Sequence, residues 1–191
     1  MNMRKILVLI GPSAVGKTTV MGEIIRVHPE FEFIRSATTR APRGDGHDSE
    51  YIYLTETEFL GRVKRGEMLE YTRFGENLYG TPSSEIERIF DCGKIPLLIL
   101  DINGVSTLKG SPRTFETCAV YLTADIEVLD ERLYARMIKD GNIQAYERRK
   151  AQNRYDLANL SKICGLFSAV IKNSDVKACA MQTVKAFYKQ K

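Results

Sequence analysis

The segment from Arg4 to Val20 reads RKILVLIGPSAVGKTTV and decides the fold of the chain. Its apolar run, Ile6 to Ile10, leads into Gly11 to Thr18, which matches the G-x-x-x-x-G-K-[ST] pattern of a phosphate-binding P-loop. Glycines at both ends let the backbone turn with its N–H groups inward, and the helix that begins near Lys17 adds its positive dipole end. We expect Lys17 to reach the β- and γ-phosphates of a nucleotide, and the Thr18 hydroxyl to bind a shared Mg²⁺ ion. The apolar strand before the motif and the amphipathic helix after it favour a nucleotide site over an ordinary strand-to-helix turn.

The composition is typical of one soluble globular domain. The 191 residues are 43% hydrophobic and 27% charged, with a net charge of +4 that is spread along the chain. Such a charge suits an anionic substrate and does not by itself indicate a nucleic acid partner. No stretch approaches the roughly 18 apolar residues of a membrane span, and the N-terminal apolar run is too short for a signal peptide. We therefore expect a cytoplasmic protein that binds neither membrane nor nucleic acid.

The cysteines do not indicate a metal site. Cys92, Cys118, Cys164 and Cys179 are far apart and show no C-x-x-C spacing. This spacing disfavours zinc and agrees with a reducing cytosol.

Strand-like and helix-like segments alternate along the rest of the chain. This alternation predicts an α/β fold with a parallel sheet, covered by helices on both faces and joined by right-handed crossovers. The expected strands after the first are 31–36, 51–54, 68–74, 95–102, 119–122 and 169–172. The expected later helices are 56–64, one that starts at Thr81 and Pro82, 125–139, 145–160 and one that follows Ser174. Asp101 ends a buried strand and should emerge at the carboxyl edge of the sheet, where open α/β folds bind ligands.

Seven short segments carry a resemblance to a known family. They are GPSAVGKTT at the P-loop, SATTRAPRGD after the second strand, and then EYIY, EMLEY, NLYGT, LLILDIN and VIKNSD. With these segments in this order, the chain resembles the guanylate kinase family of P-loop nucleoside monophosphate kinases. The resemblance implies a three-layer P-loop NTPase fold and one guanylate-kinase-like domain over 1–191. Within it we expect a core at about 1–36, 81–136 and 150–191, a nucleoside-monophosphate-binding subdomain at about 37–80, and a helical lid at about 137–149.

The loop after the second strand carries residue types that suit a phosphate. Arg40 and Arg43 offer planar, permanently charged forks, and Ser36, Tyr51 and Tyr79 offer hydroxyl groups. The resemblance implies that all five hold the phosphate of the acceptor nucleotide. Without it, a solvated basic loop and tyrosines packed in a small core would explain the same residues.

Base selection is expected to depend on Glu70, Thr81 and Asn103. A carboxylate accepts two adjacent hydrogen bonds, which matches the N1–H and N2–H₂ donors of guanine, and adenine lacks that donor pair. The resemblance places Glu70 and Thr81 at the guanine. Asn103 stands where the family has an acid near the guanine, and this departure bears on acceptor preference. Taken alone, Glu70 would be interpreted as a surface glutamate on a strand.

The donor site is expected to use the P-loop and a late asparagine. The resemblance implies that Asp101 orients Mg²⁺ through water, and that Asn173 and Asp175 lie at the adenine pocket, although either could be a turn or cap residue. The expected ATP-binding residues are Gly11, Pro12, Ser13, Ala14, Val15, Gly16, Lys17, Thr18, Thr19 and Asn173.

Two arginines are expected to close over the transferring phosphoryl group. The resemblance assigns this role to Arg136 and Arg149, which together with Lys17 and Asp101 form the expected catalytic set. Arg132, Arg148 and Arg154 compete for the assignment, and a solvated helical face is the alternative. The P-loop has Ala14 where the family usually has glycine, and residues 137–143 lack the Arg-Gly-Thr character of the family's lid.

The sequence thus predicts ATP-dependent, Mg²⁺-dependent phosphorylation of GMP, and of dGMP, to the diphosphate. Two alternatives remain open. One is a kinase of the same fold that acts on another phosphorylated acceptor, such as a sugar phosphate. The other is a non-catalytic guanylate-kinase-like module that holds a phosphorylated protein. The retained Lys17, Thr18 and Asp101 disfavour the module.

Overall fold

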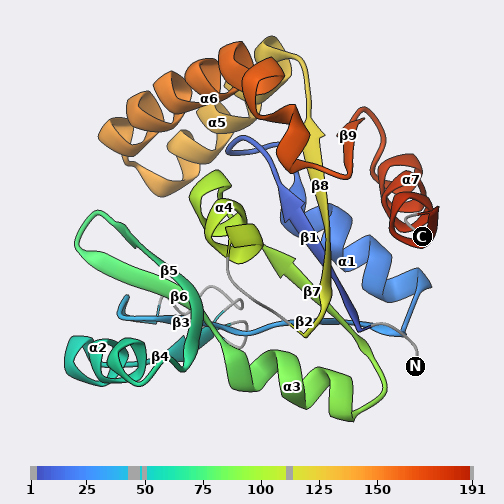
Figure 1. The fold of residues 1–191 in the computed structure, drawn as a ribbon. Helices are drawn as coiled ribbons and strands as arrows, with labels where there is room; N and C mark the ends of the chain where they lie inside the picture. Colours follow the sequence, from blue (N-terminus) through green and yellow to red (C-terminus); the bar gives the residue numbers. More distant parts are fainter. Residues whose placement is uncertain (1–3, 43–47, 49–50, 111–113, 190–191) are drawn as a thin grey trace.

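The computed structural model describes residues 4–42, 48, 51–110 and 114–189. Within these ranges the chain forms two β-sheets, and helices pack around the larger one (Figure 1). The α/β fold with a central parallel sheet is therefore as the sequence predicts.

The larger sheet is parallel and has the strand order β2-β7-β1-β8-β9. Its strands are β1 (Lys5–Ile10), β2 (Phe31–Phe33), β7 (Ile95–Ile99), β8 (Glu116–Thr123) and β9 (Ala169–Lys172). The central strands are continuous apolar runs because helices cover the sheet on both sides. The strand β1 pairs with both β7 and β8, so the loop that follows β1 emerges at the middle of the sheet's carboxyl edge.

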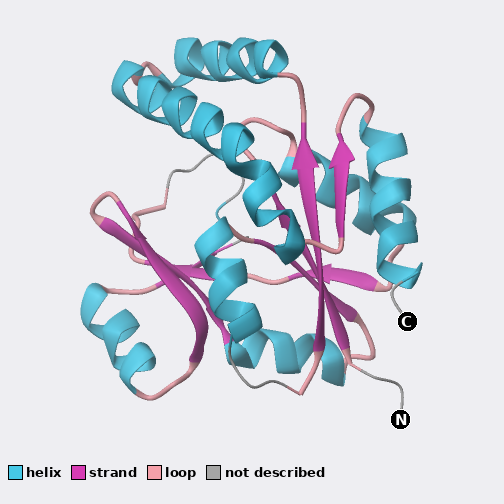
Figure 2. Cartoon of the chain, turned by 45° about the horizontal axis from the view of Figure 1, so that its top comes forward, coloured by secondary structure: helices cyan, strands magenta, loops and turns pink. Residues whose placement is uncertain are grey.

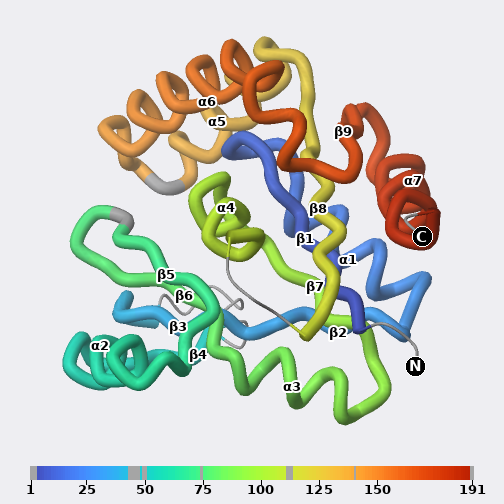
Figure 3. The backbone as a smooth tube through the Cα atoms, in the orientation of Figure 1, coloured from blue at the N-terminus to red at the C-terminus, as the bar shows by residue number. Residues whose placement is uncertain are grey.

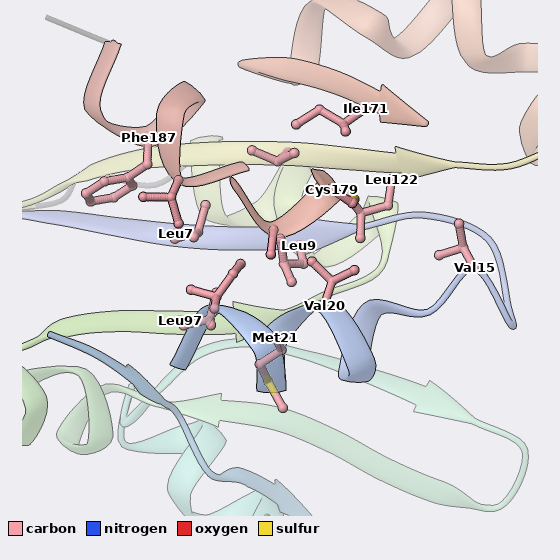
Figure 4. Close-up of a cluster of buried hydrophobic side chains, with 14 of the residues drawn as sticks. Leu7, Leu9, Val15, Val20, Met21, Leu97, Leu122, Ile171, Cys179 and Phe187 are labelled. Carbon is pink, nitrogen blue, oxygen red and sulfur yellow. The ribbon is translucent and has the colours of Figure 1, made fainter. Parts of the chain in front are cut away.

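Two pairs of helices cover the two faces of this sheet. On one face lie α1 (Lys17–Val27) and α7 (Val176–Lys189), and on the other lie α3 (Ser83–Asp91) and α4 (Ile102–Gly110). Figure 4 shows the core on the α1 and α7 side, where Val15 of the loop after β1 joins the side chains of the strands and helices. The core therefore extends directly beneath the phosphate-binding motif.

Two long helices project beyond the sheet. These are α5 (Ile126–Asp140) and α6 (Ile143–Ile163), which lie side by side at the top of Figure 1. Arg154 of α6 donates to Asp130 of α5 at 2.8 Å, which joins the two helices. A short 3₁₀ helix, η2 (Cys164–Leu166), then leads to β9.

The smaller sheet has the order β4-β3-β6-β5 and stands apart from the larger one (Figure 2). It contains β3 (Ser36–Thr38), β4 (Tyr51–Tyr53), β5 (Met68–Phe74) and β6 (Asn77–Pro82). Helix α2 (Glu56–Lys64) packs on one side of it and begins with the capping box that the sequence predicts. A small core of its own consists of Ala37, Phe59 and Leu78.

Several details of the sequence-based prediction are wrong, among them the expected strand 95–102, which is β7 and ends at Ile99. The expected strand 31–36 is two strands, and Figure 3 shows the chain running from β2 of the larger sheet into β3 of the smaller one. Thr81 lies within β6, and α3 begins at Ser83, because strand pairing with β5 extends to the end of β6. Helix α4 was not expected, since its sequence INGVSTLKG contains two glycines and little helix propensity.

The crossing point between the two sheets is held by an ion pair. Arg35 lies between β2 and β3, and its Nη2 and Nε atoms bind the Glu85 carboxylate of α3 at 2.8 and 3.1 Å. Arg88 also binds Glu85, so this nearly buried carboxylate has two cationic partners. These partners hold the pKa of Glu85 below its ordinary value, although desolvation acts in the opposite direction.

Candidate functional site

The loop between β1 and α1 has the conformation that a phosphate cradle needs. Gly11 has a φ of 143° and Gly16, the N-cap of α1, has a φ of 98°, and such values strongly favour glycine. A Cβ at Gly11 would lie 2.2 Å from the carbonyl oxygen of Leu122, so the loop can pass over β8 only with glycine there. Both glycines of the motif are thus required by a positive φ, and Gly11 is required also by its close approach to β8.

Ala14 is the strained residue of this loop. Its φ is 64°, the only positive value among the described non-glycine residues. The left-handed conformation costs an L-residue about 1–2 kcal/mol, which glycine in the same place would avoid. Contacts from elsewhere in the molecule must therefore stabilise the loop.

Three side chains from distant parts of the chain provide those contacts. Asn153 of α6 binds Ser13 with both ends of its amide, since Ser13 N–H donates to Oδ1 at 2.8 Å and Nδ2 donates to Ser13 O at 3.0 Å. Asn173, just after β9, donates to the carbonyl of Val15 at 2.7 Å. Arg132 of α5 donates to the same carbonyl at 3.3 Å.

Asn153 was not predicted as a site residue from the sequence. The signal it left is weak: an asparagine, which is a poor helix former, stands in the interior of a long helix. Asn173 was expected to bind ATP. It lies at the P-loop and is almost fully buried, and its amide is bound to the loop backbone.

Lys17 lies inside the curve of the loop. Its Nζ donates to the carbonyl oxygens of Gly11 and Pro12 at 2.7 and 3.0 Å. Part of the side chain is exposed, yet the surroundings desolvate the amine, and this burial lowers the pKa of Lys17 to about 8. The charge of Arg136 also lowers this pKa, whereas the charges of Asp156 and Asp101 raise it.

A cavity of about 540 Å³ opens beside the loop. The P-loop and the start of α1 form one wall, and α5 and the segment from β9 to α7 form the rest. The lining residues are Ala14, Gly16, Lys17, Thr18, Thr19, Arg132, Arg136, Asn173 and Val176. The P-loop amides, an amine and two guanidinium groups thus surround one space, which suits a polyphosphate.

The arginines that compete for the lid role have different surroundings. Arg132 and Arg136 both line the cavity, and Arg136 is close enough to lower the pKa of Lys17. Arg154 is bound to Asp130. Arg149 is half-buried on the first part of α6, and the neighbouring Arg148 is exposed. The assignment of Arg136 and Arg149 to the phosphoryl group stays a prediction.

Asp101 and Glu70 meet at the start of α4. The Asp101 carboxylate accepts a hydrogen bond from the Gly104 N–H at 2.7 Å, which caps this helix. A Cβ at Gly104 would lie 3.3 Å from Asp101 Oδ1 and 3.3 Å from Glu70 Oε2. Glycine therefore lets the two carboxylates approach the same turn, one from each sheet. Asn103, the neighbouring residue, is exposed.

Glu70 is a buried carboxylate. It is 5% exposed, and the Thr81 hydroxyl donates to its Oε1 at 2.6 Å. The alternative interpretation of this residue taken alone, a surface glutamate on a strand, is thus wrong. Burying a carboxylate is costly unless hydrogen-bond donors or charges compensate, and the bond from Thr81 is one such compensation.

Strand alternation gathers the other acceptor candidates on the face of the smaller sheet opposite α2. Ala37 and Leu78 face Phe59 of α2, and residues one position away face the other side. The register pairs Ser36 with Tyr51, Thr38 with Tyr79, and Glu70 with Thr81. This face, which we call the acceptor face, carries Ser36, Tyr51, Glu70, Tyr79 and Thr81.

Arg40 lies next to the acceptor face. Its guanidinium group is 5.2 Å from the centre of the Tyr51 ring and 5.9 Å from that of Tyr53. Its Nη1 donates to the carbonyl of Ala41 at 3.0 Å. Arg43, the second expected arginine, lies outside the described residues.

The described residues fit a magnesium ion shared with a nucleotide. Thr18 is exposed at the cavity, and Asp101 is close enough to Lys17 to raise its pKa. Hydroxyl and carboxylate oxygens are ligands that Mg²⁺ accepts. Nowhere in the described part of the chain do three or more His, Cys, Asp or Glu side chains form a metal cage. A magnesium ion held mainly by phosphates and water needs no such cage.

No helix in the described ranges is long and apolar enough to span a bilayer.

Comparisons with known proteins identify relatives that align with nearly the whole chain. The family model described as guanylate kinase matches residues 3–191. A guanylate kinase of Prochlorococcus marinus subsp. pastoris is 30% identical over 186 residues, which cover 96% of this chain and 97% of that protein. A guanylate kinase of Streptomyces kasugaensis is 32% identical over 188 residues, or 97% of this chain and 88% of that protein. The crystal structure of guanylate kinase from Anaplasma phagocytophilum shares the fold, with a TM-score of 0.72 at 23% identity, covering 98% of this chain and 87% of that chain.

Proposed function

The chain belongs to the guanylate kinase family, and from this premise we propose that it transfers the γ-phosphoryl group of ATP to GMP. The products are ADP and GDP. We include dGMP as an acceptor, because none of the residues assigned to the base depends on the ribose 2′-hydroxyl. The family membership does not favour the two alternatives, a sugar-phosphate kinase and a non-catalytic module.

The buried carboxylate of Glu70 is the observation that carries this proposal. Its burial and its bond from Thr81 leave it directed at the turn that begins α4. Guanine offers two adjacent N–H donors to such a carboxylate, and adenine does not. A base without that donor pair would leave the buried charge poorly compensated, which discriminates strongly against it.

The acceptor's phosphate would bind at the other end of the acceptor face. The hydroxyls of Ser36, Tyr51 and Tyr79 and the guanidinium of Arg40 supply donors there, and Arg43 is proposed to join them. A dianion gains most from such charged and bidentate donors. The acceptor would thus lie along this face, with its base at Glu70 and its phosphate nearer to Arg40.

The donor's triphosphate would bind in the cavity beside the P-loop. Backbone N–H groups and Lys17 would hold its β- and γ-phosphates, and Arg136 and Arg149 would neutralise the charge that develops on the transferred group. Thr18 and Asp101 would hold Mg²⁺, directly and through water respectively, and the ion would offset phosphate charge. The chain's own task is to align two anions in line and to exclude water, so no covalent intermediate is needed.

We propose that the segment 37–80 and the segment 137–149 close over the substrates. The first carries most of the acceptor face, and the second spans the end of α5, the turn after it and the first turns of α6. Closure would keep water from the γ-phosphate. The cytoplasmic location stays a prediction from the cysteine spacing.

The test is a coupled assay of ADP release with Mg-ATP and a panel of acceptors: GMP, dGMP, AMP, UMP, CMP and ribose 5-phosphate. We expect turnover with GMP and dGMP and none above background with the others. Turnover with ribose 5-phosphate alone would overturn the assignment of Glu70 to a base. Absence of turnover with every acceptor, in a protein that binds Mg-ATP, would overturn the proposed reaction.

A further inference from the structure

Asn153 is a nearly fully buried polar side chain in the middle of α6, with 1% of its surface exposed. Both functional atoms of its amide are hydrogen-bonded, and both partners belong to the backbone of Ser13. The amide thus pairs with Ser13 as a neighbouring strand would, through one donor and one acceptor. This pairing is specific because an amide has both functions on one rigid group.

Ser13 occupies the place in the P-loop where such support matters most. It directly precedes Ala14, which holds the left-handed conformation without the freedom of a glycine. The internal bond of the loop, from Val15 N–H to Pro12 O, is long at 3.4 Å. Besides Lys17, which donates to the carbonyls of Gly11 and Pro12, side chains from outside the turn therefore hold its conformation.

Helix α6 also carries two charged residues on the same side as the neutral Asn153. Arg149 is four residues earlier and Asp156 three residues later, and these spacings place all three on one helical face. Asp156 is close enough to Lys17 to raise its pKa. The helix that bears the proposed lid arginine is therefore attached to the loop that receives the triphosphate.

We propose that Asn153 is a positioning residue that fixes the P-loop for the donor nucleotide by clamping Ser13 to helix α6. The inference rests on the proposed function, because it assumes that the loop binds the phosphates of ATP. The clamp fixes the backbone of Ser13 directly beside Ala14, which lines the cavity. It also couples the place of Arg149 to the shape of the loop, since both depend on α6.

The test compares Asn153→Ala with Asn159→Ala, a matched control on the same helix. The Asn159 amide donates to the carbonyl of Tyr155 and accepts from the Lys162 amine, and both partners lie on its own helix. We expect Asn153→Ala to raise the KM for Mg-ATP about tenfold while the KM for GMP changes less than twofold. Asn159→Ala should leave both constants unchanged. Equal rises in both KM values would mean that Asn153 only stabilises the fold, and would overturn the inference.

A second variant tests whether the clamp acts through the strained residue. Ala14→Gly removes the strain, so the double variant Asn153→Ala with Ala14→Gly should recover part of the lost Mg-ATP affinity. Loss of packing alone at Asn153 would not be recovered by a glycine in the loop. If Asn153→Ala does not yield folded protein, Asn153→Gln keeps the amide on a longer stem and should show a smaller loss of the same kind.

Calorimetric titration with magnesium and the non-hydrolysable analogue AMP-PNP separates this inference from the proposed reaction. The wild type should bind the analogue about tenfold more tightly than Asn153→Ala. If the wild type binds the analogue but does not phosphorylate GMP, the reaction is wrong and the clamp is still tested. If both proteins bind it equally, the clamp is wrong whatever the acceptor assay shows.

Discussion

In the proposed function, the P-loop and the acceptor face each bind a nucleotide, but they do so with different parts of the chain. The P-loop presents backbone groups at a sheet edge, in a conformation held by glycines, by Val15 in the core and by side chains from α5, α6 and the end of β9. The acceptor face presents side chains from neighbouring strands of a small sheet. A site built from backbone groups depends on the conformation of the loop, whereas a site built from side chains depends on the identity of its residues.

This difference explains where selectivity must lie. Backbone N–H groups and Lys17 recognise phosphate, which every nucleoside triphosphate has. In the proposed function, Glu70 would recognise an arrangement of donors that belongs to one base. Substitutions in the two regions should therefore have separable effects, one on the donor and the other on the acceptor.

The largest effect should come from Lys17→Ala. Without the amine, the charge that develops on the transferred phosphoryl group loses its fixed counter-charge, so kcat should fall about 10³-fold or more. Steady-state kinetics with Mg-ATP and GMP measure this, and equilibrium binding of GMP should stay within about twofold. Wild-type turnover in this variant would mean that the P-loop is not the donor site.

A smaller loss, about 100-fold in kcat/KM for GMP, should follow from Glu70→Gln. The amide would turn an N–H₂ group toward the donors of guanine and would accept only one hydrogen bond. The matched control is Glu67→Gln, because Glu67 is exposed and pairs with Arg65. If the affinity for Mg-ATP fell as much as that for GMP, the separation of the two regions would be contradicted.

The pH dependence of binding should also differ between the two regions. Burial lowers the pKa of Lys17 to about 8, so its charge is lost as the pH rises through that value. The Kd for Mg-ATP should therefore rise about tenfold between pH 7 and pH 9. The Kd for GMP should stay nearly constant, since the arginines keep their charge. Calorimetry at both pH values measures the two Kd values. Lys17→Met should abolish the pH dependence of the Kd for Mg-ATP. An equally strong pH dependence of the Kd for GMP would contradict the assignment of the effect to Lys17.

The smallest effect should come from Gly104→Ala. The added Cβ would lie 3.3 Å from carboxylate oxygens of Asp101 and Glu70, so both side chains must shift by a few tenths of an ångström. We expect the KM for GMP to rise about fivefold, as for other tight packing changes. Gly110→Ala is the control on the same helix, because nothing lies within 4 Å of a Cβ there. An unchanged KM for GMP would place the base elsewhere.

The contrast between the regions also decides how much could be predicted from the sequence. The P-loop was predictable because local spacing determines its shape, and the parallel strands were predictable from their apolar runs. Asn153 was not, because its contact with Ser13 joins residues that are 140 positions apart. Helix α4 was not, because its two glycines disfavour a helix, and Gly104 suits the close approach of Glu70 and Asp101 instead.

The break between β2 and β3 could not be predicted from the sequence for a similar reason. The run 31–36 has the composition of one strand, and only the tertiary fold divides it between two sheets. The burial of Glu70 likewise depends on strand pairing and on α4. The sequence shows a glutamate on a strand, and the surroundings that make it a candidate residue for base recognition come from two other elements, β6 and α4.

The ion pair of Arg35 with Glu85 has an evolutionary consequence. It joins the residue just before β3 to a residue on the helix that follows β6, so the smaller sheet leaves and re-enters the rest of the molecule at one place. A segment whose two ends are neighbours can be exchanged as a unit, since its replacement does not distort the rest of the protein. Recombination or grafting at this junction could therefore supply new acceptor preferences to an unaltered ATP-binding half.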